Sequence, residues 1–386
     1  MQISDRVHNI AASQSLAMAA RCREMQAAGI DVISMSLGEP DMDTPEHIRL
    51  ATQQAIDDHW SHYGPVAGIP SLRAAIASRQ NSVMGNAIPW QPDDVLVSVG
   101  AKMAIFNAIQ AAVNPGDEVI IPQPAWVSYG EMVKLAQGKV VPVQTTFEEN
   151  YCLTPSQLRA ALTSRTRLLI LCSPNNPTGS IYSRQQLQQL LAVLRDYPHV
   201  SILSDEVYSS LTYTCDAPTL ASFPDIANRV ILINGVSKAY AMTGYRVGWL
   251  MTKDRSFFLA CARLQGQQLT CATMIAQKAA EAALTGPQDC VEKMRKTFAE
   301  RRELICRLAS EIPAFKFHEP QGAFYLFPDV SAIGMGYNVA EKLLEQAHVA
   351  VVSGAAFGEP KCIRLSYAIS TKEIKEAMSR IKQALA

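Results

Sequence analysis

The chain has 386 residues, 48% of them hydrophobic and 18% charged, so it can bury a large core and form more than one domain. Lysine plus arginine equals aspartate plus glutamate at 35 each, and this neutral balance, without a basic stripe, argues against nucleic acid as a main partner. The nine cysteines form no Cys-x-x-Cys pair and no Cys/His cluster, which favours reduced core thiols over a metal site or disulfides.

The N-terminal segment MQISDRVHNI lacks the apolar stretch of a signal peptide. No apolar run in the chain approaches the length of a membrane span. These two features predict a cytoplasmic protein that does not bind a membrane. The first 35 residues have a charged, helical pattern and could pack on either part of the fold.

Short apolar runs recur along the chain at regular distances. They are VLVSV (95–99), EVIIP (118–122), KVVPV (139–143), RLLILC (167–172), VSILS (200–204), RVILI (229–233) and RVGWLM (246–251). Several are apolar throughout, as strands buried on both faces of a sheet would be. Helical patterns lie between them, for example 102–113 and 183–196, the second of which opens on a serine cap. The alternation predicts an α/β fold with a mostly parallel, helix-covered sheet of seven strands.

The character of the chain changes past about residue 285. A long, charged amphipathic helix is expected over 291–312, and a second helix over 371–385 closes the chain. Between them, 322–330, 348–354 and 362–368 have the composition of strands. This part of the sequence predicts a smaller α+β domain.

In a parallel sheet, ligands bind beyond the carboxyl ends of the strands, so the residues after each run are candidates for chemistry. These residues are Gly100, Ala101 and Lys102, the segment SPNNPTG (173–179), Asp205, Glu206 and Tyr208, and then Ser237, Lys238 and Arg246. Each feature alone has an ordinary interpretation as a turn, a helix start or a helix cap. Together they offer a lysine for a Schiff base, an anion site at a helix start, an acid for a protonated ring nitrogen, and Tyr and Asn for a phenolic oxygen. Those are the four chemical handles of pyridoxal phosphate.

Six segments in chain order resemble the class I aminotransferases of the fold-type-I pyridoxal-phosphate superfamily. They are LGEPDMDTP (37–45), HYGPVAGIPSLR (62–73), GDEVIIPQPAWVSY (116–129), SPNNPTG (173–179), SDEVY (204–208) and SKAYAMTGYRVG (237–248). The resemblance extends from about residue 5 to the C-terminus and is greatest to bacterial aspartate aminotransferases with a lysine in the phosphate turn. It implies a large cofactor-binding domain at 46–285 and a small domain made of 1–45 and 286–386.

The resemblance also implies a role for individual residues around pyridoxal 5′-phosphate. Lys238 would form the internal aldimine, Asp205 would pair with the pyridinium nitrogen, and Tyr208 and Asn176 would bond the ring oxygen. Trp126 would stack on the ring. The phosphate would be bound by Gly100, Ala101, the backbone N–H of Lys102, Ser237 and Arg246. Tyr63 resembles a tyrosine that reaches the phosphate in the neighbouring subunit, which implies a homodimer with shared active sites.

For the substrate, Arg364 would bind the α-carboxylate, and the backbone of Gly38 would lie beside the substrate with Trp126 and Asn176. The implied reaction is a ping-pong transamination in which the amino acid displaces Lys238 and the freed amine removes the α-proton. Lys102 resembles the lysine that meets a distal carboxylate, and Ser15, in ASQS (12–15), lies where a hydroxyl residue assists it. Ala12 and Ser15 replace the proline and threonine that the family usually has in this segment.

These features predict an aspartate aminotransferase that uses 2-oxoglutarate and forms oxaloacetate and glutamate. Prephenate, aromatic amino acids, alanine or methionine are alternative substrates. A C–S lyase that uses the same cofactor is an alternative reaction.

Overall fold

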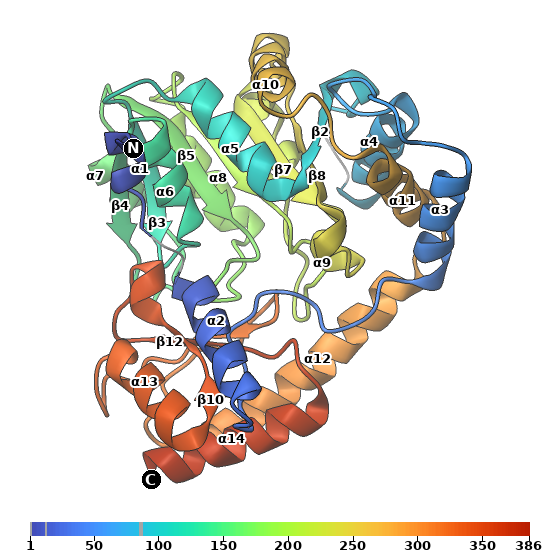
Figure 1. Cartoon of the computed structure of the whole chain (residues 1–386). Coiled ribbons are helices and arrows are strands. Elements are labelled where there is room, and N and C mark those ends of the chain that lie inside the picture. Colours follow the sequence, from blue (N-terminus) through green and yellow to red (C-terminus); the bar gives the residue numbers. More distant parts are fainter. Residues whose placement is uncertain (1, 12–13, 85–87) are drawn as a thin grey trace.

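The computed structural model describes residues 2–11, 14–84 and 88–386 (Figure 1). A seven-stranded sheet forms the upper part of the molecule in that view. Its strand order is β2 (Val95–Val99), β8 (Val247–Met251), β7 (Val230–Gly235), β6 (Ser201–Asp205), β5 (Thr166–Cys172), β3 (Glu118–Gln123) and β4 (Lys139–Gln144). Only β8 runs antiparallel to its neighbours β2 and β7. All seven predicted strands and the α/β fold are therefore confirmed.

Helices cover both faces of this sheet. One face carries α5 (Gly100–Ala112), α6 (Ser128–Leu135) and α10 (Arg255–Gln268), and the other carries α4 (Pro70–Met84), α7 (Pro155–Ala161), α8 (Arg184–Leu194) and α11 (Met274–Thr285), with α3 (Glu46–Asp57) packed on α11. Strand β5 shows why the apolar runs do not alternate. Its Leu168 and Ile170 belong to one hydrophobic cluster, while Leu169 and Leu171 belong to the cluster on the opposite face.

The second part of the molecule lies below the sheet in Figure 1. It contains α12 (Asp289–Ser310), α13 (Gly336–Ala347), α14 (Thr371–Leu385), a sheet of β11 (Val352–Ser353), β12 (Ile363–Ser366) and β9 (Tyr325–Leu326), and the pair β1 (Ile33–Ser34) and β10 (Val349–Ala350). The two C-terminal helices confirm the prediction for 291–312 and 371–385 to within two residues.

Two strands predicted in this part are wrong in extent. The expected strand 322–330 is reduced to β9, because Ala323 has a positive φ of 58° before it and Pro328, which has no N–H, follows it. The expected strand 348–354 is divided at Val351, because β10 pairs with β1 whereas β11 pairs with β12. Strand 362–368 is present as the shorter β12.

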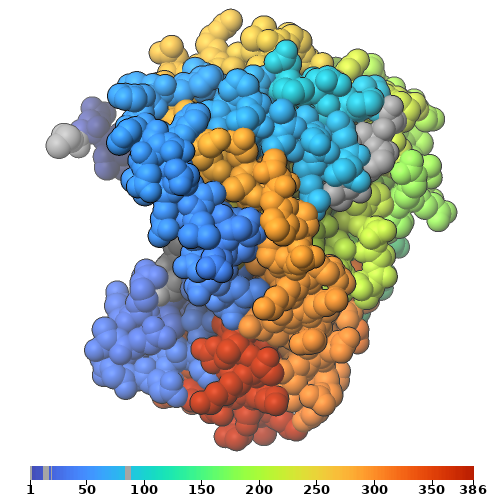
Figure 2. Space-filling model, turned by 90° about the vertical axis from the view of Figure 1, so that its right-hand side faces the viewer, coloured from blue at the N-terminus to red at the C-terminus, as the bar shows by residue number. Residues whose placement is uncertain are grey.

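The N-terminal segment contacts both parts. Helix α1 (Asp5–His8) contacts α6, and α2 (Gln14–Ala27) contacts β10 and β11. In Figure 2 a blue segment that follows the darkest N-terminal residues lies near the red C-terminal residues. Arg380 of α14 donates hydrogen bonds to Asp31. The division into 46–285 and 1–45 plus 286–386 stays a prediction. Among the described residues, no helix is long and apolar enough to cross a bilayer.

The remaining short helices are α9 (Val236–Ala239), which follows β7, and the 3-10 turns η1 (Pro92–Asp94), η2 (Leu220–Ser222), η3 (Pro224–Arg229), η4 (Thr243–Tyr245) and η5 (Gly354–Phe357).

Candidate active site

A cavity of about 370 Å³ opens at the carboxyl ends of β5, β6 and β7, beside the start of α5. Its lining includes the predicted site residues Gly38, Ala101, Lys102, Trp126, Asn176, Asp205, Tyr208, Ser237, Lys238, Arg246 and Arg364. Topology explains this gathering, because adjacent parallel strands bring their carboxyl ends to the same edge of the sheet. Residues from 38 to 364 thus reach a single cavity.

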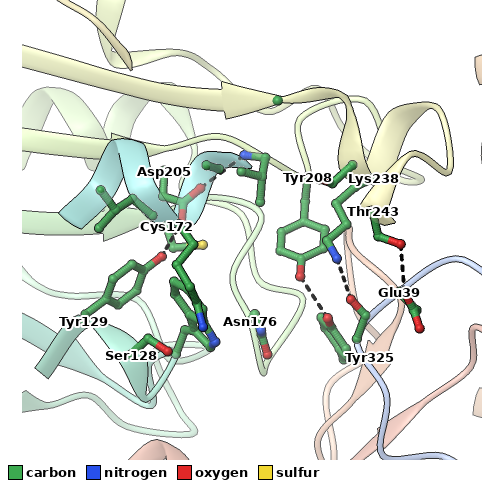
Figure 3. Close-up of a pocket in the computed structure, with 18 of the residues that line it drawn as sticks. Glu39, Ser128, Tyr129, Cys172, Asn176, Asp205, Tyr208, Lys238, Thr243 and Tyr325 are labelled. Atoms are coloured by element: carbon green, nitrogen blue, oxygen red, sulfur yellow. Dashed lines mark hydrogen bonds between the residues drawn. The ribbon is translucent and has the colours of Figure 1, made fainter. Parts of the chain in front are cut away.

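Asp205 ends strand β6 and is buried at the floor of the cavity (Figure 3). The hydroxyl of Tyr129 donates to its Oδ2 at 2.5 Å, and the backbone N–H of Val207 donates to its Oδ1 at 3.3 Å. Burial raises the pKa of Asp205 to about 6, against the opposing effects of these two hydrogen bonds and of Lys238. A cation placed beside this carboxyl would lower its pKa and keep it ionised.

Lys238 follows the neighbouring strand β7 and lies in the short helix α9. Its Nζ donates to the carbonyl oxygen of Gly38 at 2.5 Å (Figure 3). Burial lowers the pKa of this amine to about 8, and the nearby Arg246 and Arg364 lower it further, while Glu39 and Asp205 act in the opposite direction. A lysine with such a pKa is partly neutral near pH 7 and can act as a nucleophile or a base.

The start of α5 forms a corner of the cavity together with Ser237 and Arg246. Gly100 has a positive φ of 74°, and a Cβ there would lie 2.6 Å from Nη2 of Arg246. A Cβ on Gly248 would lie 2.3 Å from the backbone nitrogen of Ala101. Glycine is therefore needed at both positions to bring strand, helix start and guanidinium together. The N-cap residue Val99 has no side chain that can cap α5, and no side chain of the described residues accepts from the first N–H groups of this helix, so they could bind an anion.

Lys102 lies in the first turn of this helix, where the helix dipole disfavours a positive charge. Its Nζ lies 4.9 Å from the centre of the Trp126 ring, in a cation–π contact. Burial, and then repulsion from Arg246, lowers the pKa of Lys102. The side chain lines the cavity and remains accessible to solvent.

Arg364 enters the cavity from β12, on the other part of the molecule, and is 3% exposed. It donates from Nη1 to Oδ1 of Asn176 at 2.9 Å and from Nη2 to the carbonyl of Ser36 at 2.7 Å. Its buried Nε has no hydrogen-bond partner among the described residues. An arginine held in this way offers a planar set of donors to a carboxylate.

Asn176 and Tyr208 have protein partners in this structure. Asn176 accepts from Arg364, and the hydroxyl of Tyr208 lies 2.8 Å from that of Tyr325 (Figure 3). Both residues line the cavity, so their predicted bonds to a ring oxygen stay a prediction.

Two predicted residues, Gly100 and Tyr63, do not line the cavity, although the residues that follow Gly100 in α5, Ala101 and Lys102, do. The side chain of Tyr63 is 89% exposed and lies outside the lining. Ser15 belongs to the first turn of α2, and its side chain lies outside the described part of the structure.

Sequence reasoning missed several lining residues. They are Leu37, Glu39, Ile105, Ser128, Tyr129, Cys172, Val207, Gly235, Thr243 and Tyr325. A signal existed for Tyr129, which stands three residues after Trp126 and ends the segment GDEVIIPQPAWVSY (116–129) that carries the resemblance. None existed for Tyr325, which reaches Tyr208 only because the two parts of the chain pack together.

Comparisons with known proteins agree with this geometry. Residues 30–381 match the family described as aminotransferase class I and II. The chain is 40% identical to an aspartate aminotransferase of Bacillus sp. (strain YM-2) over 98% of each chain, and 40% identical to an aspartate/prephenate aminotransferase of Nitrosomonas europaea over 100% of each. The solved structure of an aspartate aminotransferase of Thermus thermophilus with maleate superimposes with a TM-score of 0.95 at 37% identity and covers 100% of both chains.

Proposed function

Because the chain belongs to the class I and II aminotransferases, we propose that its cavity binds pyridoxal 5′-phosphate and that Lys238 is the residue that bonds to it. The observation that carries this proposal is the placement of a buried carboxyl and a half-buried amine at the ends of two adjacent strands. Asp205 ends β6, Lys238 follows β7, and both face the same cavity, with Arg364 entering from the opposite part of the molecule.

The donor set of the cavity fits this cofactor. The free N–H groups of α5, the Ser237 hydroxyl and Arg246 suit a phosphate dianion, and the close approach at Gly100 and Gly248 makes that corner compact. Asp205 is a buried carboxyl with no cation in hydrogen-bonding contact among the described residues, so it suits a protonated ring nitrogen. The flat face of Trp126 suits an aromatic ring.

When bound, the cofactor supplies an aldehyde carbon for the amine and a ring that withdraws electrons from it. The side chains of the protein supply the proton transfer, the orientation of the substrate and the charge balance. Lys238, with a pKa near 8, can be neutral, would act as the nucleophile toward the aldehyde carbon, and can accept the proton that leaves the α-carbon of the substrate. Arg364 holds the α-carboxylate through its Nε and Nη groups, which orients the Cα–H bond toward Lys238. Asp205 would remain ionised beside the protonated ring nitrogen and would favour its protonated form.

For the substrate, we propose aspartate, with 2-oxoglutarate as the amino-group acceptor. The named activities of the Bacillus and Nitrosomonas relatives and the maleate in the Thermus structure, a dicarboxylate, support this choice. Within the chain it is supported by Lys102, whose ammonium group lines the cavity and can pair with a distal carboxylate. Prephenate is the second candidate, because the Nitrosomonas relative is named for it.

We also propose a cytoplasmic homodimer in which Tyr63 completes the phosphate site of its partner. An 89% exposed tyrosine outside its own cavity is free to reach a second subunit. The nine cysteines are all unpaired, which suits a reducing compartment.

A single-turnover screen tests the function. The purified holoenzyme would be mixed with one amino acid at a time, without a keto acid, and conversion of the cofactor to its amino form would be followed by absorbance. Rapid conversion by aspartate and glutamate supports the proposal, and conversion only by aromatic or aliphatic amino acids overturns the choice of substrate. Pyruvate and ammonia released from a sulfur amino acid would indicate the C–S lyase instead, and an absence of cofactor absorbance would overturn the cofactor assignment.

A further inference from the structure

Residues 35–44, here called the strap, cross the mouth of the cavity between the two parts of the molecule. On one side, the N–H of Met35 donates to the carbonyl of Ala350 and its carbonyl accepts from the N–H of Ser366. Asp41 accepts two hydrogen bonds from Arg301 of α12 at 2.5 and 2.9 Å. On the other side, the hydroxyl of Thr44 donates to the carbonyl of Ala241 at 2.7 Å. The strap is thus attached at both edges of the cavity.

Glu39 is the carboxylate of the strap that lines the cavity itself. The hydroxyl of Thr243, in η4, donates to its Oε2 at 2.8 Å (Figure 3). Thr243 is in turn connected to the phosphate corner, because its carbonyl accepts from Nη1 of Arg246 at 2.8 Å. Among the described residues, no arginine or lysine forms an ion pair with Glu39, so its charge is not neutralised by a direct contact with them.

The next residue along the strap contacts the reactive amine. Gly38, directly before Glu39, accepts the hydrogen bond from Lys238, so the bond from Thr243 to Glu39 also fixes the backbone that Lys238 contacts. Four charged groups from four elements face this amine: Glu39 of the strap, Asp205 of β6, Arg246 after η4, and Arg364 of β12. The phenol groups of Tyr208 and Tyr325 also line this cavity. Of the effects that favour the protonated amine, attraction from Glu39 is the largest.

We propose that Glu39 is a positioning residue for the reaction: held by Thr243, it keeps the strap over Lys238 and places a negative charge beside the lysine amine. The role rests on the proposed function of Lys238. In the reaction the amine alternates between a neutral base and an ammonium ion that has accepted the substrate proton. A carboxylate near it stabilises the ammonium form, and the Gly38 carbonyl accepts one of its hydrogens.

The first test measures the pKa of Lys238 in the cofactor-free full chain, from the pH dependence of its acetylation rate followed by mass spectrometry. Glu39→Gln retains an oxygen that accepts from Thr243 but removes the charge. The ammonium form then loses stabilisation, so the pKa should fall by about one unit and the acetylation rate near pH 6.5 should rise severalfold. Asp43→Asn is the matched control, because Asp43 is an exposed carboxylate of the same strap that does not line the cavity.

The second test uses the holoenzyme and the pH titration of its visible absorbance. Glu39→Gln should lower the transition pH of the bound chromophore in the same direction, while Asp43→Asn leaves it unchanged. Thr243→Val, which removes the hydroxyl and retains the Glu39 charge, should lower it less than Glu39→Gln does. An unchanged pKa in Glu39→Gln, or an equal fall in Asp43→Asn, would overturn the proposal. Wild-type protein without any visible chromophore would instead refute the cofactor assignment, and the acetylation test would still decide the role of Glu39.

Discussion

Two adjacent carboxyl groups end strand β6, and they have opposite surroundings. Asp205 faces the cavity, whereas Glu206 is buried beside the 3-10 turn η2. The hydroxyls of Ser204 and Thr219 both donate to Oε1 of Glu206 at 2.8 Å, and its buried Oε2 has no hydrogen-bond partner among the described residues. Burial raises the pKa of Glu206 to about 7. An ionised Glu206 therefore lowers the stability of the fold.

This difference predicts a pH-dependent effect of Glu206→Gln on folding stability. The pKa of Glu206 is higher in the folded chain than the ordinary value of 4.5 for a glutamate, so the folded state binds the proton more tightly. The wild type therefore loses stability as the pH rises from about 4.5 to 7, by at most about 3 kcal/mol. The substitution should raise the free energy of unfolding, relative to wild type, more at pH 8 than at pH 4.5, as measured by urea denaturation. Glu300→Gln, at an exposed position on α12, is the control. An equal difference at both pH values would show that folding does not raise the pKa of Glu206.

We propose that the choice of substrate depends on Lys102. Lys102→Ala should reduce kcat/KM for aspartate and glutamate by about 10- to 100-fold, because a charged hydrogen bond to the distal carboxylate is lost. Phenylalanine has no distal carboxylate, so its kcat/KM should change far less, and it serves as the internal control. Steady-state kinetics with the three amino acids measure the effect. An equal loss for all three would assign Lys102 to the structure of the α5 start instead.

At the scale of elements, the site depends on how closely strand β8 approaches the first turn of α5. Gly248 of β8 pairs with Gly235 of β7 and with Ser98 of β2, and the backbone of Ala101 lies directly above it. A side chain at Gly248 would push the N–H groups of α5 away from Ser237 and Arg246. The corner in which we propose that the phosphate binds therefore depends on a close backbone contact between β8 and α5 that is not a hydrogen bond.

Gly248→Ala should weaken binding of the cofactor by about tenfold or more, because the added Cβ would lie 2.3 Å from the nitrogen of Ala101 and the backbone must shift. Gly244→Ala, four residues earlier, is the matched control, since a Cβ there has nothing within 4 Å. Spectroscopic titration of the cofactor-free protein with pyridoxal phosphate measures both. Similar affinities in the two variants would mean that the corner is not where the phosphate binds.

At the scale of the whole molecule, the site draws on distant parts of the chain, and we propose that a second subunit completes it. The strap, β12 and the large sheet meet at the cavity, but Tyr63 faces away into solvent. If Tyr63 acts in the partner's site, an active site contains Lys238 from one protomer and Tyr63 from the other.

Mixing two defective variants tests this arrangement. Lys238→Ala and Tyr63→Ala, unfolded and refolded together in equal amounts, should recover about a quarter of wild-type activity, because half of the dimers are hybrids and each hybrid has one intact site. Each variant treated alone is the control, with Lys238→Ala inactive and Tyr63→Ala strongly impaired. A mixture no more active than the average of the two would place Tyr63 in its own protomer's site or in no site.

The sequence by itself determined the large sheet and the residues at its strand ends. Strands buried on both faces must be apolar throughout, so all seven were visible as runs, and the residues after them, such as Asp205 and Lys238, had to meet at one edge. In the smaller part, strands such as β10 and β11 have two residues each, and composition cannot locate elements so short.

Tertiary structure decided which side chains touch. Tyr129 reaches Asp205, Asn176 reaches Arg364, and Tyr208 reaches Tyr325 across 76, 188 and 117 residues of chain. Such contacts depend on how helices and sheets pack, and local sequence patterns carry no information about them. The same holds for Glu39, whose segment was recognised by resemblance. The hydrogen bond that Glu39 accepts from Thr243 and its position near Lys238 arise because the strap connects the two parts of the fold.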